Sequence, residues 1–440
     1  MNQNIKKVTN IPCQRWFRII PPIIIVYIVG FMDRTNISFA IAGGMSKELA
    51  MTASVSGLAA GIFFIGFLFL QVPGGLLAER SSGKKLITYV VIVWGIIATL
   101  GGFVTNVNEL LIVRFLLGVA EGCVLPCLLT MLSHWFPDEE IGRANALCIM
   151  NVPIASIITG PLSGFILANY SWRYVFIIEG IISLSVLFVW LPMISDRPDD
   201  AKWISKEEKD YINQKMLEQQ GNVNDKMSKK VGFKDILQNK NIWKLVLLNL
   251  FYQTGIYGFS LWLPTTLKNL TNSGMAMVGI LSIFPYIGTI IGLYVFANLS
   301  DKSKNRKKYI IIPILSFALC LYLSVVFKQH MWVSFAFLVG CGVFLQAAAG
   351  VFWTIPPTLF SGDVAAASRG IINALGNLGG FLGPFIVGWF IQKYSYNYAI
   401  YFLVCSLIVA SLITLSLPKY LGGTIKIKDK EKLKCFKQIL

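Results

Sequence analysis

Long apolar runs recur along this chain at nearly regular intervals, and they constrain its fold more than any other feature. Each run has the length that an α-helix needs to cross a bilayer, about 20 residues at about 1.5 Å per residue. The runs cover residues 19–42, 54–78, 86–104, 108–132, 143–168, 172–194, 242–267, 275–299, 308–327, 331–354, 364–391 and 396–418. The sequence therefore predicts an all-α integral membrane protein with twelve transmembrane helices.

The composition agrees with a protein that lives in lipid. Hydrophobic residues make up 55% of the chain and charged residues only 14%. The net charge of +17 is spread between the apolar runs and at the two ends, so it predicts no nucleic-acid partner. The eight cysteines form neither a CxxC pair nor a Cys/His metal spacing, and we expect no metal and no cofactor. The first run lacks a small-residue cleavage site and is predicted to be a retained span.

Lysine and arginine collect on one side of the predicted spans. They are frequent in a tail over residues 1–18, in a central loop over residues 195–241 and in a basic tail over residues 419–440. Because cytoplasmic loops carry this excess, both termini and the central loop are predicted to be cytoplasmic. The two helical bundles are then residues 19–194 and 242–418, in a cell membrane that we expect to be a bacterial inner membrane.

An internal repeat supports two equivalent halves. Glu79 and Asp301 are 222 residues apart and follow the second and eighth runs, and Lys84 and Arg306 have the same separation. Two parallel six-helix halves around a central cavity explain this repeat, with alternating access to a site near the membrane midplane.

The repeated loops combine acids with bases at the ends of helices. We expect the acids to bind helix N-termini on the cytoplasmic side and the bases to face anionic headgroups, so that the loops act as a conformational latch. The alternative is that the basic residues only mark the cytoplasmic side. The predicted latch residues are Gly75, Glu79, Arg80, Lys84, Asp301 and Arg306.

Two pairs of charges lie inside predicted spans of the first half. Asp33 and Arg34 are adjacent in the first run, and Arg114 and Glu121 are seven residues apart in the fourth, nearly on one helix face. Charges at that depth are costly and usually functional. Arginine binds a carboxylate through two parallel hydrogen bonds, and the proton occupancy of a buried acid depends on whether its arginine is engaged. The pattern predicts an anion site with proton coupling.

Structural explanations for these charges remain open. Asp33 and Arg34 could form a salt bridge with each other or with another helix, Arg114 could extend to the membrane surface, and Glu121 could have a purely structural role. In the second half, Gln253 and Tyr257 could bind hydroxyls or a ring of a substrate, or could instead join helices.

Several motifs together resemble one family. They are the Gly75–Lys85 loop, Asp33–Ser38, Arg114–Glu121, Ser133–Pro137, Trp172–Arg173, Asp196–Pro198 with Ala201–Trp203, Phe352–Trp353 and Gly376–Phe381. The chain resembles the major facilitator superfamily and, within it, the anion:cation symporter family of sugar-acid and aromatic-acid permeases. This resemblance implies that Asp33 and Glu121 carry protons, that Arg34 and Arg114 govern substrate charge, and that Trp353 and Asn373 line the cavity.

Departures from the family leave the substrate open. The galactonate-type branch places tyrosines where this chain has Phe31 and Phe67, and Asn151 with Pro153 is more typical of tartrate-like and hydroxyphenylacetate-like permeases. The expected function is proton-coupled symport of a small organic carboxylate by a monomer. The alternatives are an anion exchanger, a uniporter or a nutrient sensor. An enzyme is not expected, because the sequence shows no cluster of a nucleophile with a base or of metal ligands.

Overall fold

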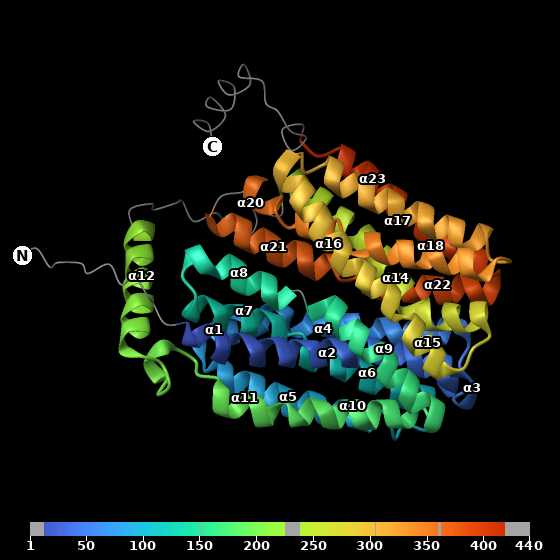
Figure 1. Ribbon diagram of the computed structural model, residues 1–440, viewed down its shortest axis with the longest axis horizontal. Coiled ribbons are helices and arrows are strands. Elements are labelled where there is room, and N and C mark those ends of the chain that lie inside the picture. Colours follow the sequence, from blue (N-terminus) through green and yellow to red (C-terminus); the bar gives the residue numbers. More distant parts are fainter. Residues whose placement is uncertain (1–12, 150, 225–237, 304, 360–361, 419–440) are drawn as a thin grey trace, which may run out of the picture. The chain divides into compact units, whose positions relative to one another are not determined.

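The computed structural model describes residues 13–149, 151–224, 238–303, 305–359 and 362–418 (Figure 1). Within these ranges the chain is helical and contains no strand. Eleven of the described helical stretches are long and apolar enough to cross a membrane. A further helix, α14 (Lys240–Thr271), has 32 residues and carries Asn249 and Gln253 within its apolar sequence. The predicted all-α membrane fold is confirmed, and the set of helices fits a twelve-helix transporter.

Two compact units make up the chain. The first comprises residues 1–36, 65–156 and 171–229, and the second comprises residues 37–64, 157–170 and 230–440. Three of the five boundaries between these units fall inside long helices, so the units differ from the two halves that the repeat predicts. The division into six-helix halves at 19–194 and 242–418 stays a prediction, and the predicted tail over residues 419–440 lies outside the described residues.

The helices follow the apolar runs closely. Those that lie wholly or partly in the first unit are α1 (Gln14–Arg18), α2 (Ile20–Ala40), α4 (Ala53–Arg80), α5 (Gly83–Leu100), α6 (Val107–Glu121), α7 (Val124–Trp135), α8 (Asp138–Ile149), α9 (Asn151–Asn169), α10 (Arg173–Ser185), α11 (Leu187–Met193), the 3₁₀ helix η2 (Pro198–Asp200) and α12 (Lys206–Asn224). Helices α5 and α10 pack side by side (Figure 1).

The remaining elements belong to the second unit. They are the π-helix η1 (Ile41–Met45), α3 (Ser46–Glu48), α14, α15 (Met275–Leu281), α16 (Ile283–Ser303), α17 (Lys308–Val326), α18 (Met331–Leu345), α19 (Ala349–Phe352), α20 (Pro356–Leu359), α21 (Gly362–Gly376), α22 (Gly379–Lys393) and α23 (Tyr396–Leu415). Helix α14 is central to this unit, because it packs on α21, α22 and α23.

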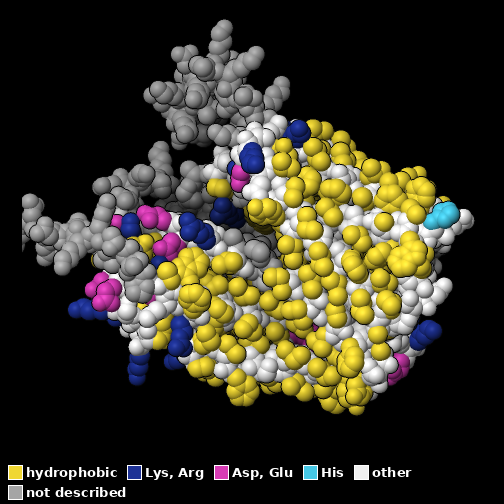
Figure 2. Space-filling view, viewed as in Figure 1, with side chains coloured by type: hydrophobic (Ala, Val, Ile, Leu, Met, Phe, Trp, Pro, Cys, Tyr) yellow, Lys and Arg dark blue, Asp and Glu magenta, His cyan; other side chains and the backbone are white. Residues whose placement is uncertain are grey.

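The outer surface of the helices is apolar. Large side chains such as Phe188, Tyr294 and Trp332 are 84%, 73% and 67% exposed. Figure 2 shows hydrophobic side chains spread over the visible face, with lysine, arginine and acidic residues gathered toward its edges. Such a surface is stable only where lipid covers it, and the helices satisfy their backbone hydrogen bonds internally, as a membrane requires.

A buried ion cluster joins the segment before α2 to the predicted central loop. The Arg15 guanidinium pairs with Glu208 of α12 at 2.6 Å and with Glu140 of α8 at 2.7 Å. Glu208 is fully buried, and its two oxygens also accept hydrogen bonds from the backbone N–H groups of Gln14 and Arg15. The start of the first span and the central loop therefore lie at the same end of the first unit, as the predicted topology requires.

Replacing Glu208 with glutamine is expected to destabilise the protein by about 3 kcal/mol, because the buried Arg15 loses a charged partner. Thermal unfolding of the purified protein, followed by fluorescence, measures the loss. The matched control is Glu218→Gln on the same helix, where the acid is exposed and pairs only loosely with Lys215. Equal effects of the two substitutions would show that the buried cluster contributes nothing.

Glycines let α4 approach α22 closely within the second unit. A Cβ atom at Gly57 would lie 2.2 Å from the carbonyl oxygen of Pro384, and one at Gly388 would lie 2.2 Å from that of Ala53. Both distances are far shorter than van der Waals contact allows, so the two backbones touch at these positions. Nearby, the Lys268 ammonium donates to the carbonyl oxygen of Ala42 at 2.7 Å. The end of α2 and the start of α4 are thereby fastened to α14 and α22.

Candidate functional site

The buried charges of the first unit come together around α2. Asp33 is fully buried, and its Oδ2 atom accepts hydrogen bonds from the Trp94 indole of α5 at 2.5 Å and from the Ser183 hydroxyl of α10 at 2.6 Å. Its other oxygen, Oδ1, has no hydrogen-bond partner among the described residues. The carboxylate is therefore held from one side only, and its second oxygen can still exchange a proton or accept a donor.

Arg34 points to another helix. Its guanidinium forms an ion pair with Glu121 of α6 at 3.3 Å, and the Arg34 residue is 8% exposed. The guanidinium lies 4.8 Å from the centre of the Phe67 ring and 5.4 Å from that of Phe31. Charge-assisted hydrogen bonds are usually about 2.7 to 2.9 Å long, so this pair is loose. Phe31 and Phe67, where the galactonate-type branch is expected to have tyrosines, thus flank the cation and stabilise it through their ring faces.

Arg114 is directed to the backbone of α2. Its two terminal nitrogens donate to the carbonyl oxygens of Asp33 at 3.0 Å and of Arg34 at 3.3 Å. Since Arg114 is only 1% exposed, it does not extend to the membrane surface. In this arrangement the guanidinium fixes the stretch of α2 that carries Asp33 and Arg34, and the predicted part of Arg114 in substrate binding stays a prediction.

All four charged residues predicted in the first unit therefore meet. Asp33 and Arg34 are adjacent in sequence, yet each is engaged by other helices, through Trp94 and Ser183 in one case and Glu121 in the other. One Glu121 oxygen, Oε1, has no hydrogen-bond partner within the described ranges. Two buried carboxylates thus each keep an oxygen that is not committed, beside two arginines.

Sequence reasoning missed three residues near this cluster. Trp94 and Ser183 hold Asp33, and the single hydroxyl hydrogen of Ser183 is shared between Asp33 and the backbone carbonyl of Glu179, 2.9 Å away and one turn earlier in α10. Glu179 is itself only 1% exposed. Glu179 lies inside the sixth apolar run just as Glu121 lies inside the fourth, so its buried charge could have been predicted from the sequence. Trp94 and Ser183 carried no such signal, since both residue types are common in apolar helices.

The polar residues predicted in the second unit lie on three segments. Gln253 and Tyr257 are one turn apart on α14, Asn373 is on α21, and Trp353 directly follows α19. The Tyr257 ring packs against Phe64 at 4.4 Å, and the Trp353 ring against Phe352 at 5.1 Å. Among the described residues, no hydrogen bond or ring contact joins these four side chains to one another. Their role in substrate binding stays a prediction.

The loop after α4 is held by hydrogen bonds to Asp196, an acid that we did not predict to bind there. Asp196, which follows α11, accepts hydrogen bonds from the backbone N–H of Lys84 at 2.7 Å and from the Ser82 hydroxyl at 2.5 Å. Ser82 also caps α5 by accepting from the backbone N–H of Lys85. An acid therefore does bind a helix N-terminus here, but it is Asp196, from the segment that follows the sixth span.

The other predicted latch residues take varied positions. The Lys84 ammonium donates to the carbonyl oxygen of Leu191 at 2.7 Å, and Arg80 is exposed in the last turn of α4. Asp301 and Arg306 pair with each other at 2.7 Å in the equivalent loop of the second unit. Gly75 and the side chain of Glu79 lie outside the part of the chain whose packing is described.

Replacing Asp196 with asparagine is expected to lower stability by about 1 kcal/mol, because the N-terminus of α5 loses a negative charge. Thermal unfolding in detergent tests this expectation. The control is Asp200→Asn, which removes an exposed acid four residues along the same segment. If Asp196→Asn melted at the same temperature as the control, the proposed cap would contribute nothing.

Apolar spans around a cluster of buried acids and bases define a multi-pass membrane protein of the transporter class. The profile of the Major Facilitator Superfamily matches residues 23–284 and 266–434. The chain belongs to this superfamily, and it is a transporter of small molecules, not an enzyme. Among the described residues no group of three or more His, Cys, Asp or Glu could hold a metal ion.

Relatives with stated functions cover nearly the whole chain. A quinolone resistance transporter of Acinetobacter baumannii is 31% identical over 409 residues, 90% of this chain and 92% of the relative. A putative tartrate transporter of Agrobacterium vitis is 31% identical over 411 residues, 92% of this chain and 90% of the relative. A probable galactarate/D-glucarate transporter of Escherichia coli is 25% identical, covering 93% and 95%. The names of the tartrate and galactarate/D-glucarate transporters are consistent with the anion:cation symporter type that the motifs predict.

A solved structure shows the same fold. The crystal structure of a D-xylose-proton symporter aligns with a TM-score of 0.71 over 93% of this chain and 99% of that chain, at 16% identity. At that identity the likeness concerns the fold alone.

Proposed function

We propose that the chain is a proton-coupled symporter of a small organic carboxylate, which it carries by alternating access. The single observation that carries this proposal is the buried cluster around α2, where Arg34 pairs with Glu121 and Asp33 keeps one uncommitted oxygen. A fixed positive charge in an apolar interior attracts an anion, and nearby acids that can be neutralised provide the proton sites.

Competition for Arg34 couples the anion to the proton in this proposal. A substrate carboxylate that takes both terminal nitrogens of Arg34 displaces Glu121, whose pairing is already loose at 3.3 Å. A buried carboxylate without a counter-charge is costly, and a proton removes that cost. Substrate and proton therefore bind together, and the reverse exchange restores the Arg34–Glu121 pair after release. Arg114, through the backbone of α2, keeps the two charges in place.

The class of acid follows from two lines of support. Relatives named for tartrate and for galactarate and glucarate suit a carboxylate substrate. The Phe31 and Phe67 rings beside Arg34 offer no hydroxyl group to a sugar acid. We therefore place a tartrate-like or an aromatic acid ahead of a heavily hydroxylated sugar acid. The relative named for quinolone resistance adds the export of an aromatic drug as a second candidate, which the same aromatic surroundings favour.

The proposal includes the membrane topology, that is, the side of the membrane on which the termini lie. The Arg15–Glu208 pair holds the N-terminal segment and the central loop at one end of the first unit. In the second unit, the Lys307 ammonium donates to the carbonyl oxygens of Leu415 and Leu417, so the loop after α16 lies beside the end of α23. Both termini are then cytoplasmic in a bacterial inner membrane, and the transporting unit is a monomer.

Purified protein in liposomes tests the function. With an acidic outside and no membrane potential, we expect tartrate or an aromatic acid to accumulate above its external concentration. Accumulation that a protonophore abolishes indicates proton coupling. Exchange of labelled for unlabelled anion without accumulation would instead indicate an exchanger or a uniporter, and drug-dependent proton flux with a quinolone in place of the acids would indicate export.

A further inference from the structure

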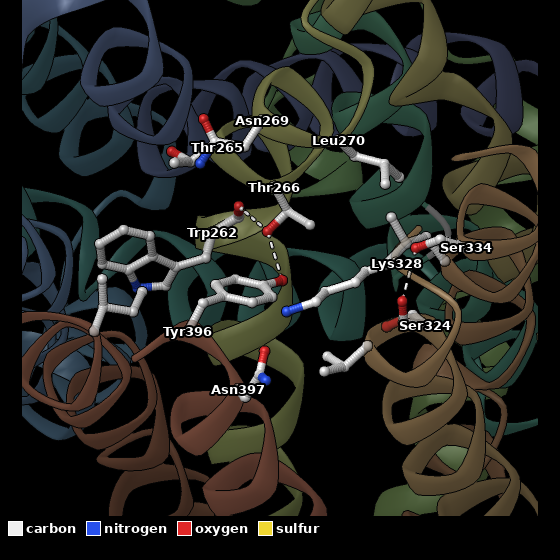
Figure 3. Close-up of a pocket in the computed structure, with 13 residues that line it drawn as sticks. Trp262, Thr265, Thr266, Asn269, Leu270, Ser324, Lys328, Ser334, Tyr396 and Asn397 are labelled. Atoms are coloured by element: carbon white, nitrogen blue, oxygen red, sulfur yellow. Dashed lines mark hydrogen bonds between the residues drawn. The ribbon is translucent and has the colours of Figure 1, made fainter. Parts of the chain in front are cut away.

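A cavity of about 400 Å³ opens in the second unit, and none of the residues that line it belongs to the buried charge cluster. It lies where the ends of α14, α17 and α22 meet the starts of α18 and α23 (Figure 3). The loop between α16 and α17 is at the other end of α17, about 28 Å away along the 19 residues of that helix. If that loop is cytoplasmic, as proposed, the cavity is on the outer side of the membrane.

The polar lining of this cavity is rich in hydroxyl and amide groups. Thr265, Thr266 and Asn269 come from α14, and Tyr396 and Asn397 come from α23. Lys328 is the one charged residue among the thirteen that line the cavity, and no acid lies among them. Figure 3 shows the Lys328 side chain extending into the space between Tyr396 and Asn397. The lining is therefore positively charged, with neutral hydrogen-bonding groups around the cation.

One hydroxyl group in the lining can be left free for a ligand, that of Tyr396. The Thr266 and Tyr396 hydroxyls lie 2.9 Å apart, and Thr266 also lies within 3.0 Å of the Trp262 carbonyl oxygen. If Thr266 donates to that carbonyl, Tyr396 donates to Thr266 and presents its own oxygen as an acceptor. The cavity then accepts a hydroxyl hydrogen as well as offering donors.

The remaining walls are mainly apolar, with two serines whose hydroxyls bond to backbone carbonyls. Trp262 is nearly buried, and its indole N–H donates to the carbonyl oxygen of Pro384 at 3.2 Å, so its ring is fixed. The Ser334 hydroxyl donates to the carbonyl oxygen of Ser324 at 2.8 Å and joins the start of α18 to the end of α17. A preformed cavity with a few convergent polar groups has the features of a ligand site.

We propose that this cavity binds a small oxyanion that carries neighbouring hydroxyl groups. Lys328 pairs with the anionic oxygens, and Tyr396 and the two asparagines bind the hydroxyls. Two sources share this chemistry: a free hydroxycarboxylate such as tartrate, and the phosphate and glycerol of an anionic lipid headgroup. The site shares no residue with the Asp33–Arg34 cluster, so it does not depend on the proposed transport function.

The first test uses tartrate as the soluble probe. Thermal unfolding of delipidated protein is followed across a tartrate titration, with sodium chloride at matched ionic strength. The comparison is between Lys328→Gln and Lys393→Gln, a control that removes a cation at the same end of the second unit but outside the cavity. Tartrate bound at the transport site affects both variants alike. We expect Lys328→Gln alone to weaken the protection by about tenfold in concentration, as the loss of a charge-assisted hydrogen bond implies.

The second test uses lipid. Native mass spectrometry of the detergent-solubilised protein counts molecules of phosphatidylglycerol or phosphatidylcholine that stay bound. Loss of one phosphatidylglycerol in Lys328→Gln, but not in Lys393→Gln, identifies a lipid headgroup as the occupant, while a Lys328 effect in the tartrate arm identifies a free anion. Lys328→Arg should keep the binding, and Tyr396→Phe, which removes only a hydroxyl group, should weaken it. If neither arm distinguishes Lys328→Gln from Lys393→Gln, the proposal is overturned.

Discussion

An Asp33→Asn variant is expected to lose proton-driven accumulation of substrate while it still exchanges substrate across the membrane. Each coupled proton allows about tenfold accumulation for one pH unit, and a neutral amide cannot carry that proton. The amide also fits the site, because its oxygen can accept from Trp94 and Ser183 as Oδ2 of Asp33 does. Uptake into liposomes under an imposed pH gradient, beside counterflow of labelled substrate, separates the two activities.

The matched control for this experiment is Glu109→Gln. Glu109 is an acid at the start of α6, where it only caps the helix through Thr105 and Asn106. Its replacement should leave accumulation unchanged. Full accumulation by Asp33→Asn would rule out Asp33 as the coupling acid and would direct attention to Glu121, whose Gln variant is measured in the same way.

Breaking the Arg34–Glu121 pair from one side is expected to destabilise the protein by about 3 kcal/mol, because Arg34→Gln leaves a buried carboxylate without its partner. Removing both charges in the Arg34→Gln/Glu121→Gln double variant should recover most of that loss. Transport should be absent in the single variant and also in the double variant, since Arg34 is the proposed anion ligand. Thermal unfolding and uptake are measured on the same preparations.

This pair of variants separates a structural from a functional arginine. A purely structural ion pair predicts that the double variant regains transport along with stability. A functional pair predicts that only stability returns. Arg34→Lys is the matched control, because it keeps the charge but loses the planar fork, and it should bind the substrate more weakly without unfolding the protein.

The helices and the main charge cluster were predictable from the sequence for the same physical reason. A bilayer imposes a length on each apolar run, and α5 and α17 begin and end within a few residues of the predicted boundaries. It also penalises any charge inside such a run, so Arg114 and Glu121 stood out in α6. In the structure, Arg114 and Glu121 of α6 contact Asp33 and Arg34 of α2.

The sequence could not predict which side chains contact the buried charges and the helix ends. Trp94 and Ser183 lie 61 and 150 residues from Asp33, and only the packing of α5 and α10 against α2 brings them to its carboxylate. The cap on α5 has the same origin: Asp196 is 112 residues from Lys84. Glu179 is different, because an acid within an apolar run was visible and should have been counted with the others.

The glycine contact between α4 and α22 has a mechanical consequence. At Gly57 and Gly388 the two helices meet through backbone atoms, so no side chain has to change its rotamer when they separate. If alternating access requires α4 and α22 to separate, no interlocked side chains oppose their separation at this contact. An alanine at either position would place a methyl group between the two backbones. It would favour the state in which the helices are separated and leave the fold of each helix intact. The two glycines thus set the balance between the two conformations.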